Sequence, residues 1–128
     1  MDTSAVETFP RSTSAPRDAR RYVASLLGCW RVADRCMASL LAVSELVTNA
    51  VTHGRGPVKV RVALRRSRLR VEVEDEGPGV PAAPHAAVGV DDVGGRGLGI
   101  VASVASDWGH SRPGEHRSVV WFETTCPG

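Results

Sequence analysis

The segment ELVTNAVTHG, residues 45–54 of this 128-residue chain, has the pattern of the last turns of a long helix. Apolar side chains in it and just before it recur at three- and four-residue steps, which predicts one apolar helix face. They are Leu40, Val43, Val47 and Ala50. Glu45 and Asn49 are four residues apart, so they share a different face, about 6 Å apart along the axis. Burying both is costly without a polar partner, so this face is either solvated or covered by something polar.

Two helices and a tail are expected up to this point. Residues 1–10 are expected to be a mobile tail, with a short edge strand at residues 5–9 as a further option. Capping and stop signals predict a first helix over about residues 14–27. The second helix is expected over about residues 34–52. The domain itself then spans residues 11–128.

Beyond the second helix, the pattern changes from helical to alternating. Residues 58–64 and 68–74 alternate apolar and mostly charged side chains, which predicts a hairpin with one buried and one solvated face. Residues 80–95 are rich in Pro, Ala and Gly, which is typical of a lid or a disordered segment. A third helix is expected over about residues 97–108. Further strands are expected near residues 108–111 and 117–123. This order predicts an α+β two-layer sandwich, with a mixed or antiparallel sheet and three helices on one face.

Composition limits the classes of protein that the chain can represent. It is 42% hydrophobic and 23% charged, which predicts one domain with an adequate core. A net charge of +2 is too weak to indicate nucleic-acid binding. No apolar run can span a bilayer and no signal-peptide pattern is present, so we expect a cytoplasmic protein without membrane association. Cys29, Cys36 and Cys126 have no zinc-site spacing and are expected to be reduced thiols.

Two glycine-bearing segments follow the second helix. Asp75 ends the second hairpin strand, where its carboxylate can accept a hydrogen bond from the exocyclic amino group of adenine. Gly77 and Gly79 leave space beside it for a flat base. The same residues are equally typical of an ordinary turn.

The second glycine segment, GGRGLG at residues 94–99, opens the third predicted helix. Its exposed N–H groups and the helix N-terminus favour a phosphate. The spacing differs from the dinucleotide-binding fingerprint, and the chain has no P-loop motif. Taken alone, the segment is equally typical of a linker.

The end of the second predicted helix is followed by the two glycine-bearing segments, and the irregular region at residues 80–95 lies between those two. In this combination the chain resembles the GHKL superfamily, whose ATP-binding Bergerat fold occurs in histidine-kinase catalytic domains, type II topoisomerase ATPase subunits and Hsp90-type chaperones. The stretch SELVTNAVTHG looks most similar to the anti-sigma-factor serine/threonine kinases. The resemblance extends from about Phe9 to Phe122.

The resemblance implies a role for each matching residue. Glu45 matches a general base and Asn49 a Mg²⁺ ligand. Asp75, with Gly77 and Gly79, matches the box that binds adenine. Arg96 either reaches the terminal phosphate or faces solvent. The phosphate-binding box corresponds to Gly95, Gly97, Leu98 and Gly99. The position beside the adenine corresponds to Ser118.

The implied cofactors are ATP and Mg²⁺, and the implied partners are proteins. As an enzyme, the protein would transfer the γ-phosphoryl group of ATP to a Ser or Thr of an anti-sigma antagonist, sequester a sigma factor, or do both, and so regulate transcription. The alternative is a non-catalytic module that uses ATP to hold a partner-binding shape. A detached histidine-kinase catalytic domain is disfavoured because no pair of long helices with a phosphoacceptor His is present. The resemblance also allows a homodimer.

Overall fold

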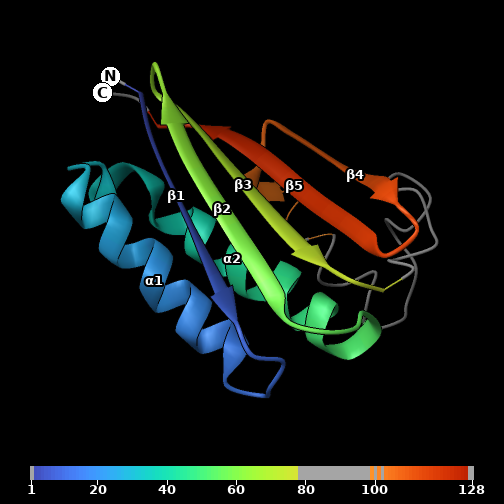
Figure 1. Cartoon of the computed structure of the whole chain (residues 1–128). Coiled ribbons are helices and arrows are strands. Elements are labelled where there is room, and N and C mark those ends of the chain that lie inside the picture. The colour runs from blue at the N-terminus through green and yellow to red at the C-terminus, as the bar shows by residue number, and fades with distance from the viewer. Residues whose placement is uncertain (1, 78–98, 100, 102, 127–128) are drawn as a thin grey trace.

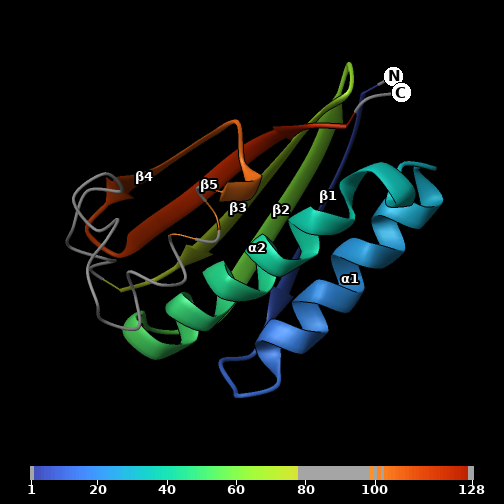
Figure 2. The ribbon, with the colours of Figure 1, turned by 180° about the vertical axis from the view of Figure 1, so that it is seen from behind.

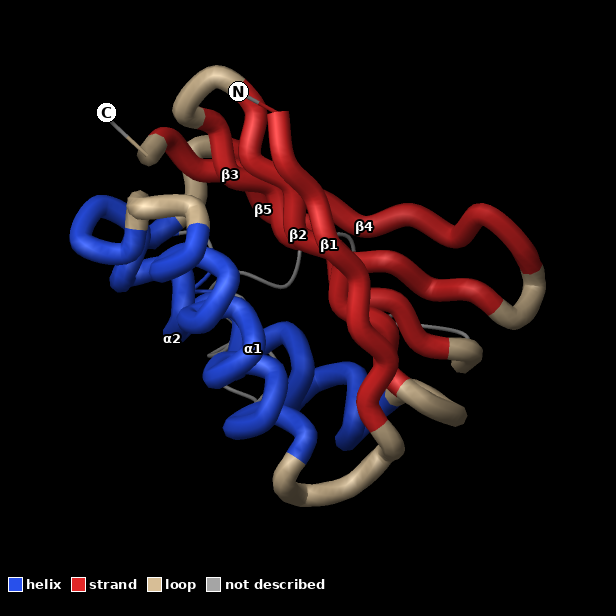
Figure 3. Tube along the Cα trace, turned by 60° about the vertical axis from the view of Figure 1, so that its left-hand side comes forward, coloured by secondary structure: helices blue, strands red, loops and turns tan. Residues whose placement is uncertain are grey.

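One antiparallel sheet, covered on one face by helices, makes up the fold (Figures 1 and 3). The computed structural model describes residues 2–77, 99, 101 and 103–126. Along the chain the elements are β1 (Asp2–Phe9), α1 (Ala15–Cys29), α2 (Ala33–His53), β2 (Val58–Arg65), β3 (Arg68–Asp75), β4 (Asp107–Gly114) and β5 (Arg117–Thr125). The strands lie in the order β1-β2-β3-β5-β4, and every neighbouring pair is antiparallel. The predicted α+β sandwich is confirmed, with an antiparallel rather than a mixed sheet.

The core lies between the sheet and the helices α1 and α2, which pack side by side on its inner face (Figure 2). Val23 and Leu27 from α1 and Val43 and Val47 from α2 are fully buried there. The sheet contributes every second residue of the predicted hairpin, including Val60, Val62, Val71 and Val73. Each such side chain contributes about 1.5–3 kcal/mol when buried. The period-two pattern therefore decided which face of the sheet the helices cover.

Two boundaries differ from the sequence-based prediction. β1 pairs with β2 along its whole length, from Asp2 opposite Arg65 to Phe9 opposite Val58, so the edge strand expected at residues 5–9 is confirmed and extends into the expected tail. Its alternation was hidden because Phe9 is the one large apolar residue on its inner face, where the others are Thr3, Ala5 and Glu7. The chain is no longer helical at Ala105, and β4 begins at Asp107, so the third helix ends earlier than predicted. Its described residues Gly99, Val101, Ser103 and Val104 are helical, and its predicted start lies outside the described residues.

The outer face of the sheet carries a ladder of ion pairs across β2, β3 and β5. Glu74 of β3 accepts hydrogen bonds from Arg61 at 2.8 Å and from Arg117 at 3.0 Å. Arg70 donates to Glu123 at 2.8 Å, and its guanidinium lies 4.2 Å from the ring centroid of Trp121. The arginine-rich hairpin is therefore a solvated, charge-paired sheet face, as the alternation predicted.

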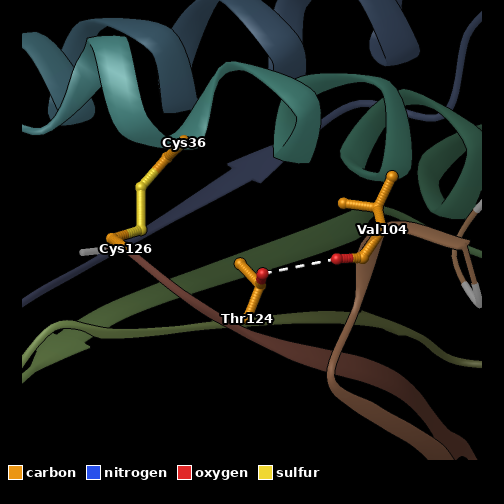
Figure 4. The surroundings of a disulfide bond; sticks show 4 residues. All are labelled: Cys36, Val104, Thr124 and Cys126. Atoms are coloured by element: carbon orange, nitrogen blue, oxygen red, sulfur yellow. Dashed lines mark hydrogen bonds between the residues drawn. A yellow bond between two sulfur atoms is a disulfide. The ribbon is translucent and has the colours of Figure 1, made fainter.

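A disulfide joins the first turns of α2 to the end of β5, which corrects the prediction of three reduced thiols. Cys36 and Cys126 are 90 residues apart in sequence, yet their Cα atoms are 5.7 Å apart and both side chains are buried (Figure 4). The N–H of Cys126 also donates to the carbonyl of Ser67, 2.6 Å away. Only the fold brings these two cysteines together, so their spacing carried no signal. Cys29 is a free, exposed thiol.

No helix in the described part of the chain is long and apolar enough to cross a membrane.

Candidate functional site

A narrow crevice opens where the C-terminal end of α2 meets the neighbouring ends of β3 and β5. Its polar lining consists of Asn49 and His53 from α2, Asp75 from β3 and Ser118 from β5. Asn49, Asp75 and Ser118 are all buried. The structure therefore brings together three of the predicted site residues, from segments up to 69 positions apart in the chain. Because burying polar groups is costly, this cluster indicates a binding site rather than a packing feature.

The carboxylate of Asp75 is oriented by backbone groups. Its Oδ1 accepts a hydrogen bond from the N–H of Gly77 at 2.7 Å and a longer one from the N–H of Arg55 at 3.4 Å. No group among the described residues hydrogen-bonds to Oδ2. One oxygen thus fixes the side chain, and the other remains available as an acceptor for a ligand N–H.

Gly54 allows Asp75 to approach the end of α2. A Cβ at Gly54 would lie 2.5 Å from Asp75 Oδ1 and 2.6 Å from the carbonyl oxygen of Ala50. Gly77 is similarly confined, since a Cβ there would lie 3.0 Å from the backbone nitrogen of Arg55. Glycines at these two positions are therefore required by close approach to the carboxylate.

Asn49 lies in the same crevice, one helical turn before His53. Only 7% of it is exposed, and no hydrogen bond to its side chain is made by the residues that the structure describes. Arg11 secures the end of this helix by donating to the carbonyl of Ala50 at 3.0 Å. The amide atoms of Asn49 are not among the fully buried polar atoms that lack a partner, so they are open to the crevice and can bind a polar ligand or a metal-bound group.

Ser118 lies directly opposite Asp75 in the register of β3 and β5. Its Oγ is 3.1 Å from Nε2 of His110 on β4, and only 1% of Ser118 is exposed. Burial lowers the pKa of His110, as does the nearby charge of Arg112, while Asp75 acts in the opposite direction. A hydroxyl and a carboxylate thus lie side by side where β3 ends and β5 begins.

Glu45 does not line this crevice. It is half-buried and lines a separate groove between α1 and α2, together with Arg17, Arg20 and Thr48. Its predicted role as a general base stays a prediction.

Other predicted site residues fall outside the described part of the chain. Gly99 is described and is helical. Gly79, Gly95, Arg96, Gly97 and Leu98 lie outside the described residues.

Three residues of the site were not singled out from the sequence. His53 is four residues after Asn49, so helical spacing alone could have placed it in the crevice. Gly54 was interpreted only as a helix stop. His110 could not have been found without the β4–β5 register, in which it pairs with Val120, two positions after Ser118. No group of three or more His, Cys, Asp or Glu side chains that could hold a metal ion occurs among the described residues.

The antiparallel sheet, the helices on one face and the crevice lined by Asn49 and Asp75 together define an α+β sandwich of the GHKL type. The chain belongs to the histidine kinase-like ATPase domain family, whose model matches residues 9–124. A comparison with curated protein sequences finds no match.

Two solved histidine kinases have a similar fold. The histidine kinase domain of the blue-light-activated kinase from Erythrobacter litoralis EL346 is 26% identical, with a TM-score of 0.54 over 70% of this chain. This chain covers 43% of that domain's chain, so less than half of it. The histidine kinase AdeS from Acinetobacter baumannii is 16% identical, with a TM-score of 0.54 over 97% of this chain and 68% of AdeS. The AdeS match supports the fold alone.

Proposed function

We propose that the protein is an ATP-binding anti-sigma regulatory factor that acts as a protein serine/threonine kinase. It would phosphorylate an anti-sigma antagonist protein, sequester a sigma factor, or do both. Family membership supports ATP binding. The observation that carries the proposal is the convergence of Asn49, Asp75 and Ser118 on one buried crevice.

The residues of the crevice fit Mg·ATP in distinct ways. The free Oδ2 of Asp75 can accept the amino N–H of adenine, and the oxygen of Asn49 can ligate Mg²⁺. A single amide ligand suits Mg²⁺, which completes its shell with water and phosphate oxygens. ATP would supply the phosphoryl group, and the metal would offset the negative charge on the phosphates.

For phosphoryl transfer, Glu45 is the proposed general base. It lies one helical turn before Asn49 but lines the groove between α1 and α2 rather than the crevice, so the role requires the terminal phosphate to extend from the crevice to the Glu45 side of α2. At that position it would accept the proton of a Ser or Thr hydroxyl on the partner protein as the oxygen attacks phosphorus and ADP leaves.

ATP binding is tested by Asp75→Asn. The amide keeps an acceptor for the backbone N–H groups but presents a donor where the adenine amino group also donates. We expect ATP affinity, measured by calorimetry, to fall about 10- to 100-fold, since a hydrogen bond to a charged group is lost. Asp107→Asn is the matched control, because Asp107 also accepts a backbone N–H but is exposed and outside the crevice. Unchanged affinity in Asp75→Asn would remove the adenine assignment.

Transfer is tested by Glu45→Ala with labelled ATP and candidate antagonist proteins. We expect phosphorylation of the partner to fall about 100- to 10,000-fold while ATP remains bound, as for loss of a general base. Glu115→Ala, an exposed change in the β4–β5 turn, is the control. If the wild-type protein transfers no phosphate to any candidate and yet binds one of them only with ATP, the non-catalytic binding module replaces the kinase as the function.

A further inference from the structure

Three neighbouring strands place Asp75, Ser118 and His110 in a row at the edge of the crevice. Asp75 on β3 is opposite Ser118 on β5, and His110 on β4 reaches Ser118 from the other side, with Nε2 3.1 Å from Oγ. Asp75 and Ser118 line the crevice, and His110 does so only through its contact with Ser118. The row therefore has two members that can touch a ligand and one that acts on its neighbour.

Whether the Ser118 hydroxyl donates a hydrogen bond to a ligand or only accepts one depends on whether Nε2 of His110 carries a hydrogen. A hydroxyl has one hydrogen to donate and lone pairs that accept. If Nε2 carries the hydrogen, it donates to Oγ, and the hydroxyl hydrogen of Ser118 is free to point into the crevice. If Nε2 lacks a hydrogen, Ser118 donates to it and can only accept from a ligand.

The ring of His110 is neutral near pH 7, because burial and Arg112 lower its pKa despite the opposing effect of Asp75. A neutral imidazole carries a single N–H, so the choice of nitrogen sets the direction of the Ser118 hydrogen bond.

The chemistry of purines selects one of these arrangements. The base-pairing edge of adenine presents an amino donor beside the acceptor N1, and guanine presents an acceptor beside a donor. Asp75 supplies an acceptor through Oδ2, so a neighbouring donor completes an edge that matches adenine and mismatches guanine. Only the arrangement with Nε2–H provides that donor.

We propose that His110 is a positioning residue that donates its Nε2–H to Ser118, so that the Ser118 hydroxyl donates to N1 of a bound adenine. This inference rests on the proposed function, since it requires the base to lie beside Asp75. It extends that function by assigning selectivity for adenine to a residue that does not itself touch the nucleotide.

The test compares the affinity of the full chain for ATP and for 1-deaza-ATP, in which N1 is replaced by C–H. The wild-type protein should bind ATP about 3- to 10-fold more tightly than the analogue, the range expected for one hydrogen bond. His110→Phe removes the N–H that fixes the direction of the Ser118 hydroxyl, so it should reduce this ratio and should also weaken the preference for ATP over GTP. His116→Phe, an exposed change in the β4–β5 turn, should leave both ratios unchanged.

Further variants separate positioning from a general structural role. His110→Asn has a side chain too short to reach Oγ and should lose the preference for ATP over 1-deaza-ATP, whereas His110→Gln keeps an N–H donor at similar reach and should retain it. In a Ser118→Ala background, His110→Phe should have no additional effect on the ratio, because the pair acts through one hydroxyl. A wild-type ratio in both His110→Phe and His110→Asn, or equal effects of His110→Phe with and without Ser118, would overturn the proposal.

Failure of this inference is distinguishable from failure of the proposed function. If Asp75→Asn weakens ATP binding while the His110 variants leave the ratio unchanged, only the role of His110 is wrong. If Asp75→Asn leaves ATP binding unchanged, the nucleotide assignment of the crevice is wrong, and the role of His110 is rejected with it.

Discussion

One end of α2 is fixed by a disulfide, whereas its other end borders a crevice of polar side chains. Near its start, Cys36 is covalently joined to Cys126 at the end of β5, beside the β2–β3 hairpin turn. Near its end, about 20 Å away along the helix axis, Asn49 and Gly54 face Asp75 across a crevice of buried polar groups. We call these the stapled end and the site end.

The difference shows where this fold places its constraints. The stapled end combines a disulfide, apolar burial and strand pairing, all of which favour the folded state. The site end places an amide and a carboxylate in a crevice with hydrogen-bonding capacity that is only partly used, which leaves both groups able to bind a ligand. The two ends should therefore respond to different perturbations, the first in stability and the second in binding.

Breaking the disulfide should produce the largest effect. The double variant Cys36→Ala/Cys126→Ala should lose about 2–5 kcal/mol of unfolding free energy, because the bond closes a loop of about 90 residues. The melting temperature should fall on the order of 10 °C, and ATP affinity should change less than about twofold. Both are measured by thermal denaturation and calorimetry.

The free thiol provides the control for this experiment. Cys29→Ala should leave the melting temperature unchanged, and a reductant should lower it in the wild-type protein but not in the double variant. Equal melting temperatures for the oxidised wild-type protein and the double variant would contradict the idea of a stapled end.

Adding a methyl group at the site end should, unlike loss of the disulfide, weaken ATP binding as well as stability. In Gly54→Ala, the new Cβ collides with Asp75 and with the carbonyl of Ala50, so the carboxylate must move. We expect a loss of about 1–3 kcal/mol in stability, typical of overpacking, together with at least a tenfold loss of ATP affinity. Gly28→Ala is the matched control, because that Cβ would meet nothing within 4 Å. Full ATP affinity in Gly54→Ala would show that Asp75 is not held as described.

The smallest effect is expected from the ion pairs on the outer face beside the site. Hydrogen bonds from Arg117, and then from Arg61, lower the pKa of Glu74 to about 2 from 4.5, against the opposing effect of burial. A carboxylate with a lowered pKa stabilises the fold above pH 4.5, and this contribution is lost as the pH falls towards 2. Because both arginines are partly exposed, it amounts to about 1 kcal/mol.

Glu74→Gln should therefore be less stable than the wild-type protein by that amount at pH 7. The difference should disappear between pH 4.5 and pH 2 in denaturant titrations at successive pH values, and ATP affinity should change less than about threefold. A constant difference across this range would mean that the ion pairs of Glu74 do not stabilise the fold.

Local patterns in the sequence were sufficient for much of the fold. Alternation in β2 and β3 and the helical spacing in α2 predicted which side chains form the core, because each depends only on the geometry of one element. The pairing of Asn49 with Asp75 was inferred from the order of three segments and the family they resemble, and the structure places both residues in one crevice.

The extent of β1 and the position of Glu45 depend on contacts between secondary-structure elements. β1 was expected to be mostly tail because, apart from Phe9, its inner face has small and polar residues whose burial depends on β2 and α1. Glu45 is four residues before the buried Asn49 but lines a different groove, because four residues exceed one helical turn and leave the two side chains about 40° apart around the axis.

The sequence by itself determined the period of each element, the identity of the apolar faces and the residue types available at the site. Tertiary structure alone decided that Cys36 meets Cys126, that Gly54 must lack a side chain beside Asp75, and that His110 reaches Ser118. The physical reason is that these contacts follow from strand register and helix placement, which the packing of the whole core sets and which short-range spacing does not encode.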